Sequence, residues 1–343
     1  MPRVAPSWLA LPVVLSVALW GCDGAKPPGL VRGPTPTTPQ VVSTTTTSPA
    51  PGTSTEPANK GLSYAPVVPW DDLSFEGRDV LYHVPDDPIA VVWAFHGTGG
   101  DTSFCLDMET VATLNALIDA GFGFVCTESA GQKWDREELD PEVNVDLAAL
   151  LRLHEYMALI TDLETNTPIY GLGFSDGGGM ATVWIKAVRA RGFEGRASAA
   201  VSSAAQAWDA DEVPIGFVLP INDPQPTAQY EVNRRLAEGV PGTDLWVPPE
   251  FPVEPEWFAR NPAVDDAEAR VAAEEAVRLG LVDDDGWRLF TLDEASTYLA
   301  AYESQALVTA PGARAQELRV AFSMHAMNAT FATEIQQFFL EWL

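Results

Sequence analysis

Residues 168–180 read PIYGLGFSDGGGM, an apolar run that leads into a glycine-rich segment. The run predicts a buried strand over 168–174, and the residues from 178 to 191 predict a helix. Between them, residues 173–177 match G-x-S-x-G, with Ser175 at the centre. Glycines there permit the sharp strand-to-helix turn that exposes a nucleophilic hydroxyl, and the backbone N–H of Asp176 would face a developing oxyanion. The alternative is a glycine-rich turn without chemistry.

The rest of the chain alternates between predicted strands and helices. Apolar runs and alternating patterns predict strands at 79–85, 89–95, 121–127, 199–204, 215–221 and 318–322. Helical spacing of apolar residues predicts helices at 106–120, 143–161 and 332–343. Such alternation is typical of an α/β protein with a mainly parallel central sheet flanked by helices.

Residues 227–313 interrupt this rhythm. They contain prolines, tryptophans and one helix-like stretch at 265–279. We interpret them as an insertion before the last predicted strand, 318–322. The insertion could form a cap over the site, or it could be a helical excursion packed on the side of the sheet.

A serine nucleophile needs a general base, and the chain has four histidines. His83 lies within a predicted strand, and His154 lies on the apolar face of a predicted helix. His96 follows a predicted strand and more plausibly supports its loop. His325 lies between the last predicted strand and the final helix, where a loop residue can reach the carboxyl edge of the sheet. The sequence therefore predicts His325 as the base.

The base in turn needs a carboxylate that orients it. Asp223 follows the predicted strand 215–221, and it lies between the serine and the histidine in the chain order expected for this arrangement. Asp209 and Asp211 are rivals after the preceding strand. Asp223 could instead only cap the turn before Pro224.

A second glycine-rich segment, His96-Gly97-Thr98-Gly99-Gly100, follows the predicted strand 89–95. Glycines allow the backbone to approach a substrate closely. A phosphate-binding loop is a poor alternative, because the Lys-Ser/Thr ending of that motif is missing. Trp134, Trp208 and Trp246 could line an apolar pocket nearby, or they could pack in the core.

Residues 80–343 resemble α/β-hydrolases, specifically the secreted group that includes polyhydroxybutyrate depolymerase-like enzymes and feruloyl esterases. The resemblance rests on HGTGG at 96–100, GFSDGGGM at 173–180, IND at 221–223 and His325 before an amphipathic helix. It implies an α/β-hydrolase fold, a Ser175–His325–Asp223 triad and ester hydrolysis through an acyl-enzyme. It also implies that the Thr98 N–H is the second oxyanion donor, with Gly99 in reserve.

The first 22 residues, MPRVAPSWLALPVVLSVALWGC, have an apolar run too short to span a bilayer, which predicts a signal peptide. Its end resembles the lipobox of bacterial lipoproteins, in which Cys22 would be lipidated. The alternative is a secretory signal with an incidental cysteine. We expect a lipid-anchored protein of the bacterial cell envelope, outside the cytoplasm and attached to the membrane. Residues 23–66 are rich in Pro and Thr and are expected to be a disordered linker, or an O-glycosylated stalk.

Composition excludes some classes of function. The net charge of -28 argues against nucleic-acid binding. The three cysteines and four histidines are scattered, so we expect no metal site and no cofactor. Cys105 and Cys126 could form a disulfide or remain free thiols.

The sequence thus predicts a serine esterase that acts on a small-molecule or polymeric ester. Two alternatives stay open. One is a non-catalytic, lipid-anchored binding protein on the same fold, and the other is peptide or amide hydrolysis by the same groups.

Overall fold

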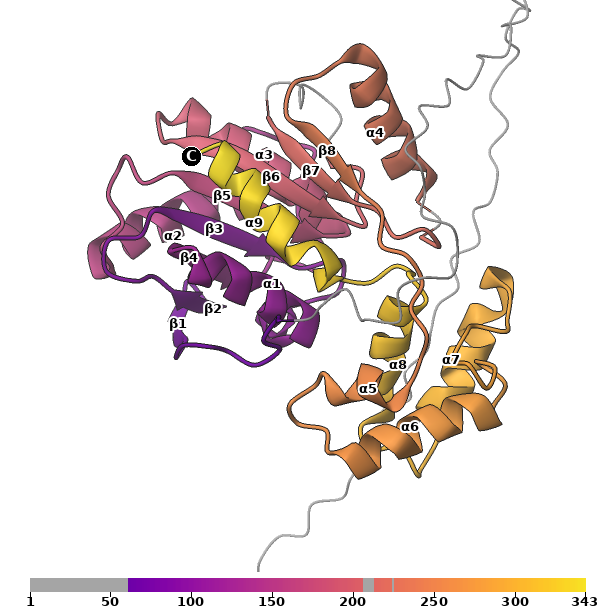
Figure 1. Cartoon of the computed structure of the whole chain (residues 1–343). Coiled ribbons are helices and arrows are strands. Elements are labelled where there is room, and N and C mark those ends of the chain that lie inside the picture. Colours follow the sequence, from indigo (N-terminus) through magenta and orange to yellow (C-terminus); the bar gives the residue numbers. More distant parts are fainter. Residues whose placement is uncertain (1–60, 206–212, 224) are drawn as a thin grey trace, which may run out of the picture. The chain divides into compact units, whose positions relative to one another are not determined.

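The computed structural model describes residues 61–205, 213–223 and 225–343, all within one compact unit, Ser54–Leu343. The predictions made for the signal peptide, Cys22, Trp208, Asp209 and Asp211 lie outside the described residues. Figure 1 shows the arrangement of the elements. No helix in the described ranges has the length and apolar character needed to cross a bilayer.

Within the described residues, the strands form one eight-stranded sheet in the order β1-β2-β4-β3-β5-β6-β7-β8. The first two pairs, β1–β2 and β2–β4, are antiparallel, and the remaining pairs are parallel. This confirms the predicted α/β fold class with a mainly parallel central sheet. The strands are β1 (Asp71–Phe75), β2 (Arg78–His83), β3 (Ala90–Phe95), β4 (Phe122–Thr127), β5 (Ile169–Phe174), β6 (Gly195–Val201), β7 (Ile215–Val218) and β8 (Thr243–Trp246).

Helices cover both faces of this sheet. Side chains alternate between faces along a strand, so the wholly apolar β3 contributes to two separate cores. Val91, Trp93 and Phe95 pack in the core that includes α2 (Val145–Ile160) and α3 (Asp176–Ala190). The intervening residues of β3 pack in the core of the opposite face, beneath α1 (Met108–Asp119) and α9 (Ala332–Glu341). The side chains within the strands are thus used for packing, and the functional groups lie in the turns that follow the strands.

The predicted strand at 318–322 is wrong. Residues 318–321 belong to the helix α8 (Pro311–Ala321), which begins with proline at its first position. The five residues 318–322, apolar except for Arg319, are too few to distinguish a strand from a buried helical turn by periodicity, and the structure shows a helix. The last strand is instead β8, which lies inside the predicted insertion 227–313 and directly after α4 (Pro226–Glu238).

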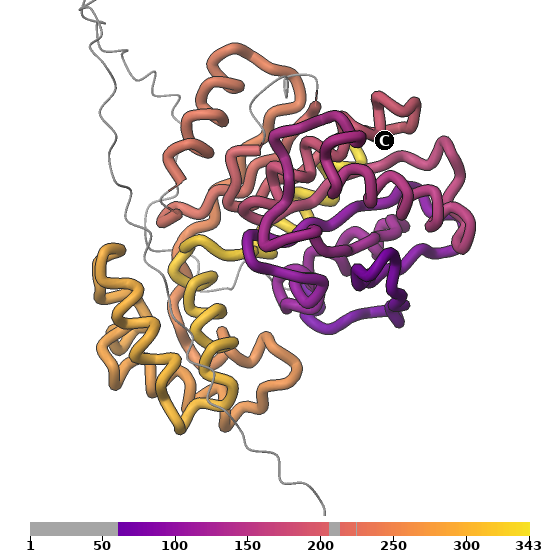
Figure 2. Tube along the Cα trace, turned by 180° about the vertical axis from the view of Figure 1, so that it is seen from behind, coloured from indigo at the N-terminus to yellow at the C-terminus, as the bar shows by residue number. Residues whose placement is uncertain are grey.

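The true insertion therefore starts after β8 rather than at residue 227. Its helices α5 (Pro255–Ala259), α6 (Asp266–Arg278), α7 (Ala295–Glu303) and α8 gather around a hydrophobic core of their own. Figure 2 shows them as a group of coils seen from behind. The insertion contacts α1, because Arg260 after α5 pairs with Glu109 at 3.2 Å.

The folded region begins before residue 67, because contacts of the fold already include residues of the predicted linker, 23–66. The Asn115 side chain donates hydrogen bonds to the carbonyl oxygens of Ser63 and Ala65, both at 2.7 Å. Tyr64 is buried against the same helix, α1. These contacts place residues 63–65 in the folded unit.

Candidate active site

Ser175 lies on a strained turn between β5 and α3. Its backbone has a φ of 53° and a ψ of -117°, a conformation that non-glycine residues rarely adopt. Glycines at 173 and 177 make the turn possible. A Cβ on Gly173 would lie 2.0 Å from the carbonyl oxygen of Gly177, and one on Gly177 would lie 2.1 Å from that of Phe95. The two glycines of the motif thus allow the backbone segments to pack closely, and the turn presents the Ser175 hydroxyl at the end of β5.

The structure brings Ser175, His325 and Asp223 together. The Nε2 atom of His325 lies 3.0 Å from the Ser175 Oγ, and its Nδ1 atom lies 2.9 Å from Asp223 Oδ2. In this arrangement Nδ1–H donates to the carboxylate, which leaves Nε2 free to accept the serine proton. The Asp223 side chain is 1% exposed and that of His325 is 35% exposed. The acid is therefore shielded from water, while the ring can reach a substrate.

The two loops that carry the acid and the histidine are joined by their neighbours. The Asn222 N–H donates to the Ser323 carbonyl oxygen at 2.9 Å, and the Asn222 side chain donates to that of Phe322 at 2.8 Å. Asp223 itself lies in the turn that follows β7, with its N–H bonded to Pro220 at 3.0 Å. The strand ends at Val218 and not at Ile221, so the predicted strand was too long.

The sequence predicts the backbone N–H groups of Asp176 and Thr98 as the oxyanion donors. Asp176 opens α3, and Thr98 lies in the loop after β3. That loop is close to the serine, since a Cβ on Gly97 would lie 3.2 Å from the Cβ of Ser175. The N–H of Gly99 already donates to the Gln132 carbonyl oxygen at 2.5 Å. This bond favours Thr98 over Gly99 as an oxyanion donor.

The other three histidines, His83, His96 and His154, lie in strands, loops or helices where their contacts serve the fold. The His96 Nδ1–H donates to the Gly97 carbonyl oxygen at 2.6 Å, and its Nε2 accepts the Ser129 N–H at 3.1 Å. Burial lowers the pKa of His154 to about 4, so this ring stays neutral near pH 7. His83 lies half-buried at the end of β2.

Contacts to Asp176 were not anticipated. Its carboxylate accepts the Trp134 N–H at 2.8 Å and pairs with the Arg136 side chain at 3.1 Å. Trp134 is 2% exposed, and its indole N–H donates to the His96 carbonyl oxygen at 2.9 Å. Trp246 packs edge-on against Phe338 in the core. No sequence signal marks the Asp176 contacts, because they join a loop and a helix about 40 residues apart (42 for the Trp134 bond).

The disulfide question is also resolved in the structure, where Cys105 and Cys126 are bonded. Cys126 belongs to β4, and Cys105 belongs to η1 (Thr102–Leu106), the turn that follows the HGTGG loop. The bond therefore ties the segment after this loop to the sheet. Among the described residues, no group of three or more His, Cys, Asp or Glu side chains is placed to hold a metal ion.

A cavity of about 250 Å³ lies between α8 and the segment that begins α1. Asp107, Met327 and Glu317 are among its lining residues. Burial raises the pKa of Asp107 to about 6 and that of Glu317 to about 7. Glu317 is 3% exposed, and Arg314 and Asn261 hydrogen-bond to it. Desolvation of the charged carboxylate outweighs these partners.

Glu317→Gln is expected to weaken the pH dependence of stability. The folded protein binds more protons than the unfolded chain between the ordinary carboxyl pKa of 4.5 and about 7, so the free energy of unfolding falls as pH rises through this window. The loss is on the order of 3 kcal/mol for a shift of this size. Glutamine keeps an oxygen acceptor and cannot ionise. We expect Tm to fall less from pH 5 to pH 8 in this variant than in the wild type.

Thermal unfolding at the two pH values measures this difference. Exposed Glu334 provides the control, because Glu334→Gln should leave the Tm difference between pH 5 and pH 8 at its wild-type value. Equal Tm differences in Glu317→Gln and the wild type would contradict the raised pKa.

No model of a known protein family matches this chain, and no curated protein matches it. Solved structures do match. A ferulic acid esterase is 14% identical over 52% of this chain and 88% of its own, with a TM-score of 0.42. A bacterial heroin esterase is 16% identical over 55% and 77%, with a TM-score of 0.41. An S-formylglutathione hydrolase from Staphylococcus aureus is 10% identical over 52% and 90%, with a TM-score of 0.41.

Proposed function

We propose that this chain is a serine hydrolase that cleaves carboxylic esters through an acyl-enzyme. One observation carries the proposal: the His325 ring contacts the Ser175 Oγ at 3.0 Å through one nitrogen and Asp223 at 2.9 Å through the other. A serine activated by an oriented histidine is a nucleophile suited to acyl transfer.

In the first half of the reaction, the Ser175 Oγ attacks the ester carbonyl carbon and its proton passes to His325 Nε2. The carbonyl oxygen becomes an oxyanion, which the N–H groups of Thr98 and Asp176 stabilise. The C–O bond to the alcohol then breaks, and Nε2 returns the proton to the departing alcohol. The product is an ester between the acyl group and Ser175.

In the second half, water attacks the acyl carbon and gives its proton to His325 Nε2. The bond to Ser175 breaks, the proton returns to Oγ, and the carboxylic acid leaves. Throughout, Asp223 accepts the Nδ1–H, fixes the tautomer of the ring and stabilises its cation.

A substrate panel tests this proposal. We expect purified protein to hydrolyse p-nitrophenyl acetate and butyrate and to be far slower on a peptide p-nitroanilide. Methyl ferulate and short hydroxybutyrate oligomers would test the finer assignment to the feruloyl esterase or depolymerase-like group. Faster cleavage of the anilide than of every ester would support amide hydrolysis. Absence of turnover on all substrates would support a binding role.

We also propose that the protein is anchored through a lipid on Cys22, outside the bacterial cytoplasm. The support is the lipobox-like sequence that ends at this cysteine and the Pro/Thr-rich stretch that follows it. Metabolic labelling with an alkyne fatty acid tests the anchor, since Cys22→Ser should abolish incorporation. Equal incorporation in both proteins would reject it.

A further inference from the structure

The loop between β4 and α2 contacts the glycine-rich loop that contains Thr98. Gln132 accepts the Gly99 N–H at 2.5 Å, and the Trp134 indole donates to the His96 carbonyl oxygen at 2.9 Å. Ser129 adds a third bond, from its N–H to the His96 ring at 3.1 Å. The residues on both sides of Thr98 are therefore attached to the segment 129–134.

The same loop also holds the other oxyanion donor. Both carboxylate oxygens of Asp176 are occupied, one by the Trp134 N–H at 2.8 Å and one by the Arg136 guanidinium at 3.1 Å. Asp176 is 8% exposed, so these charge-assisted contacts are made largely out of water. The segment 129–136 thus bridges the two backbone N–H groups that would bind the oxyanion.

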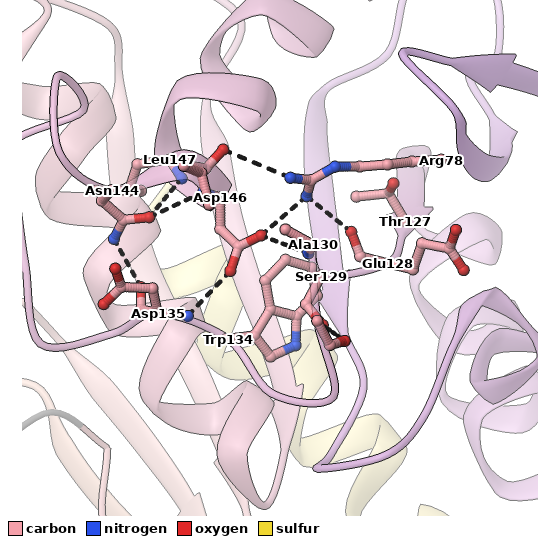
Figure 3. Close-up of polar contacts among 12 residues, drawn as sticks. Arg78, Thr127, Glu128, Ser129, Ala130, Trp134, Asp135, Asn144, Asp146 and Leu147 are labelled. Atoms are coloured by element: carbon pink, nitrogen blue, oxygen red, sulfur yellow. Dashed lines mark hydrogen bonds and ion pairs between the residues drawn. The ribbon is translucent and has the colours of Figure 1, made fainter.

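Asp146, in the first turn of α2, fixes this segment at both ends (Figure 3). Its Oδ1 accepts the Ala130 N–H at 2.7 Å, and its Oδ2 accepts the Asp135 N–H at 2.9 Å. Arg78 pairs with Oδ1 at 3.0 Å. The Asp146 side chain is only 2% exposed, so its hydrogen bonds compete little with water.

Two neighbours complete the network around Asp146. Arg78 also donates to the Glu128 carbonyl oxygen at 2.9 Å, at the start of the loop. The Asn144 side chain donates to the carbonyl oxygens of Asp135 and Glu138 at 2.6 and 2.7 Å, and its own oxygen caps α2. The loop is thereby tied to β2 and to α2, two rigid elements of the core.

We propose that Asp146 is a positioning residue of the oxyanion hole. It sets the separation of the Thr98 and Asp176 N–H groups by holding the segment that bridges them, and it touches neither the substrate nor the triad. The inference rests on the proposed ester hydrolysis. Donor geometry matters at this scale, because a displacement of about 1 Å can lower a rate about 100-fold.

Asp146→Asn, in the full-length protein, tests the proposal. The amide retains one oxygen, but its NH₂ group would face an N–H donor of the segment. We expect kcat on p-nitrophenyl butyrate, expressed per active site titrated with a fluorophosphonate, to fall about 10- to 100-fold. KM should stay within about threefold, because the ground-state ester needs the oxyanion donors less than the transition state does. A trifluoromethyl ketone, which binds as an oxyanion adduct, should lose affinity by a similar factor.

Glu275→Gln is the matched control. It removes a buried carboxylate, 4% exposed and paired with Arg278, from α6 in the insertion. Its kcat per titrated site should equal that of the wild type. Dividing the rate by the number of titrated sites separates two effects. A purely structural role of Asp146 would lower the folded fraction and leave kcat per titrated site unchanged, whereas a positioning role lowers kcat per site.

Trp134→Phe keeps the test decisive if Asp146→Asn does not fold. Phenylalanine retains an aromatic ring near Phe95, and it removes the indole N–H that bonds to His96 together with part of the ring volume. We expect kcat per titrated site to fall several-fold with KM unchanged. If Asp146→Asn folds and its kcat per titrated site equals that of the wild type, the positioning role is overturned. If Asp146→Asn does not fold, a wild-type kcat per titrated site in Trp134→Phe overturns it. Absence of turnover by the wild type would instead reject the proposed function.

Discussion

Ser175→Ala is expected to lower kcat for ester hydrolysis by about 10⁶-fold, the scale seen when a serine nucleophile is removed from a triad. Without the hydroxyl no acyl-enzyme forms, and His325 has no proton to accept at 3.0 Å. The turn itself depends on the glycines at 173 and 177, and alanine removes only the Oγ atom. Substrate binding and Tm should therefore stay close to those of the wild type.

Steady-state kinetics on p-nitrophenyl butyrate and labelling by a fluorophosphonate measure the effect of Ser175→Ala. Labelling should disappear, and the mass added to the wild type should map to the peptide that contains Ser175. Ser304→Ala, which removes an exposed hydroxyl from the insertion, should keep full rate and full labelling. Equal labelling of Ser175→Ala and the wild type would remove this serine from the mechanism.

Asp223→Asn is expected to lower kcat by about 10⁴-fold with little change in KM. An asparagine NH₂ group would donate to His325 Nδ1, so the ring proton would move to Nε2. In that tautomer Nε2 cannot accept the proton of Ser175. The Asp223 side chain is 1% exposed, so water cannot replace it as the partner of the ring.

The measurement for Asp223→Asn is again kcat per folded molecule, with circular dichroism to check the fold. Asp244→Asn is the control, because Asp244 is exposed on β8, away from the triad bonds. A rate in Asp223→Asn within about tenfold of the wild type would assign the orienting carboxylate elsewhere. The rival acids Asp209 and Asp211, outside the described residues, would then be tested in the same way.

Local patterns were sufficient for the elements closest to Ser175. The apolar β5, the glycine turn and α3 follow one another within a few residues, and their conformation depends on steric contacts among neighbours. The same holds for β3, whose six buried residues leave little alternative to a central strand. These segments were predicted correctly, and they determine both the fold class and the position of the hydroxyl.

Local sequence patterns did not predict the secondary structure of segments whose conformation depends on packing against distant residues. Leu318, Val320 and Ala321 would be buried in a strand or in a helix, and their packing in the core of the insertion makes them part of α8. The four-residue β8 carries no strong strand signal and is defined by its pairing with β7. The boundaries of the insertion were therefore misplaced although its existence was predicted.

By itself, the sequence determined the strand-turn-helix around Ser175 and narrowed the base to His325, because those conclusions depend on nearby residues and on chain order. Only the tertiary structure decided that His325, 150 positions away, meets Ser175 at 3.0 Å, and that Asp146 accepts the N–H groups of Ala130 and Asp135. Parallel strands bring their carboxyl ends to one edge of the sheet, whatever their separation in the chain. A buried carboxylate such as Asp146 acquires its partners only through that convergence, since no local pattern specifies which distant N–H groups it will meet.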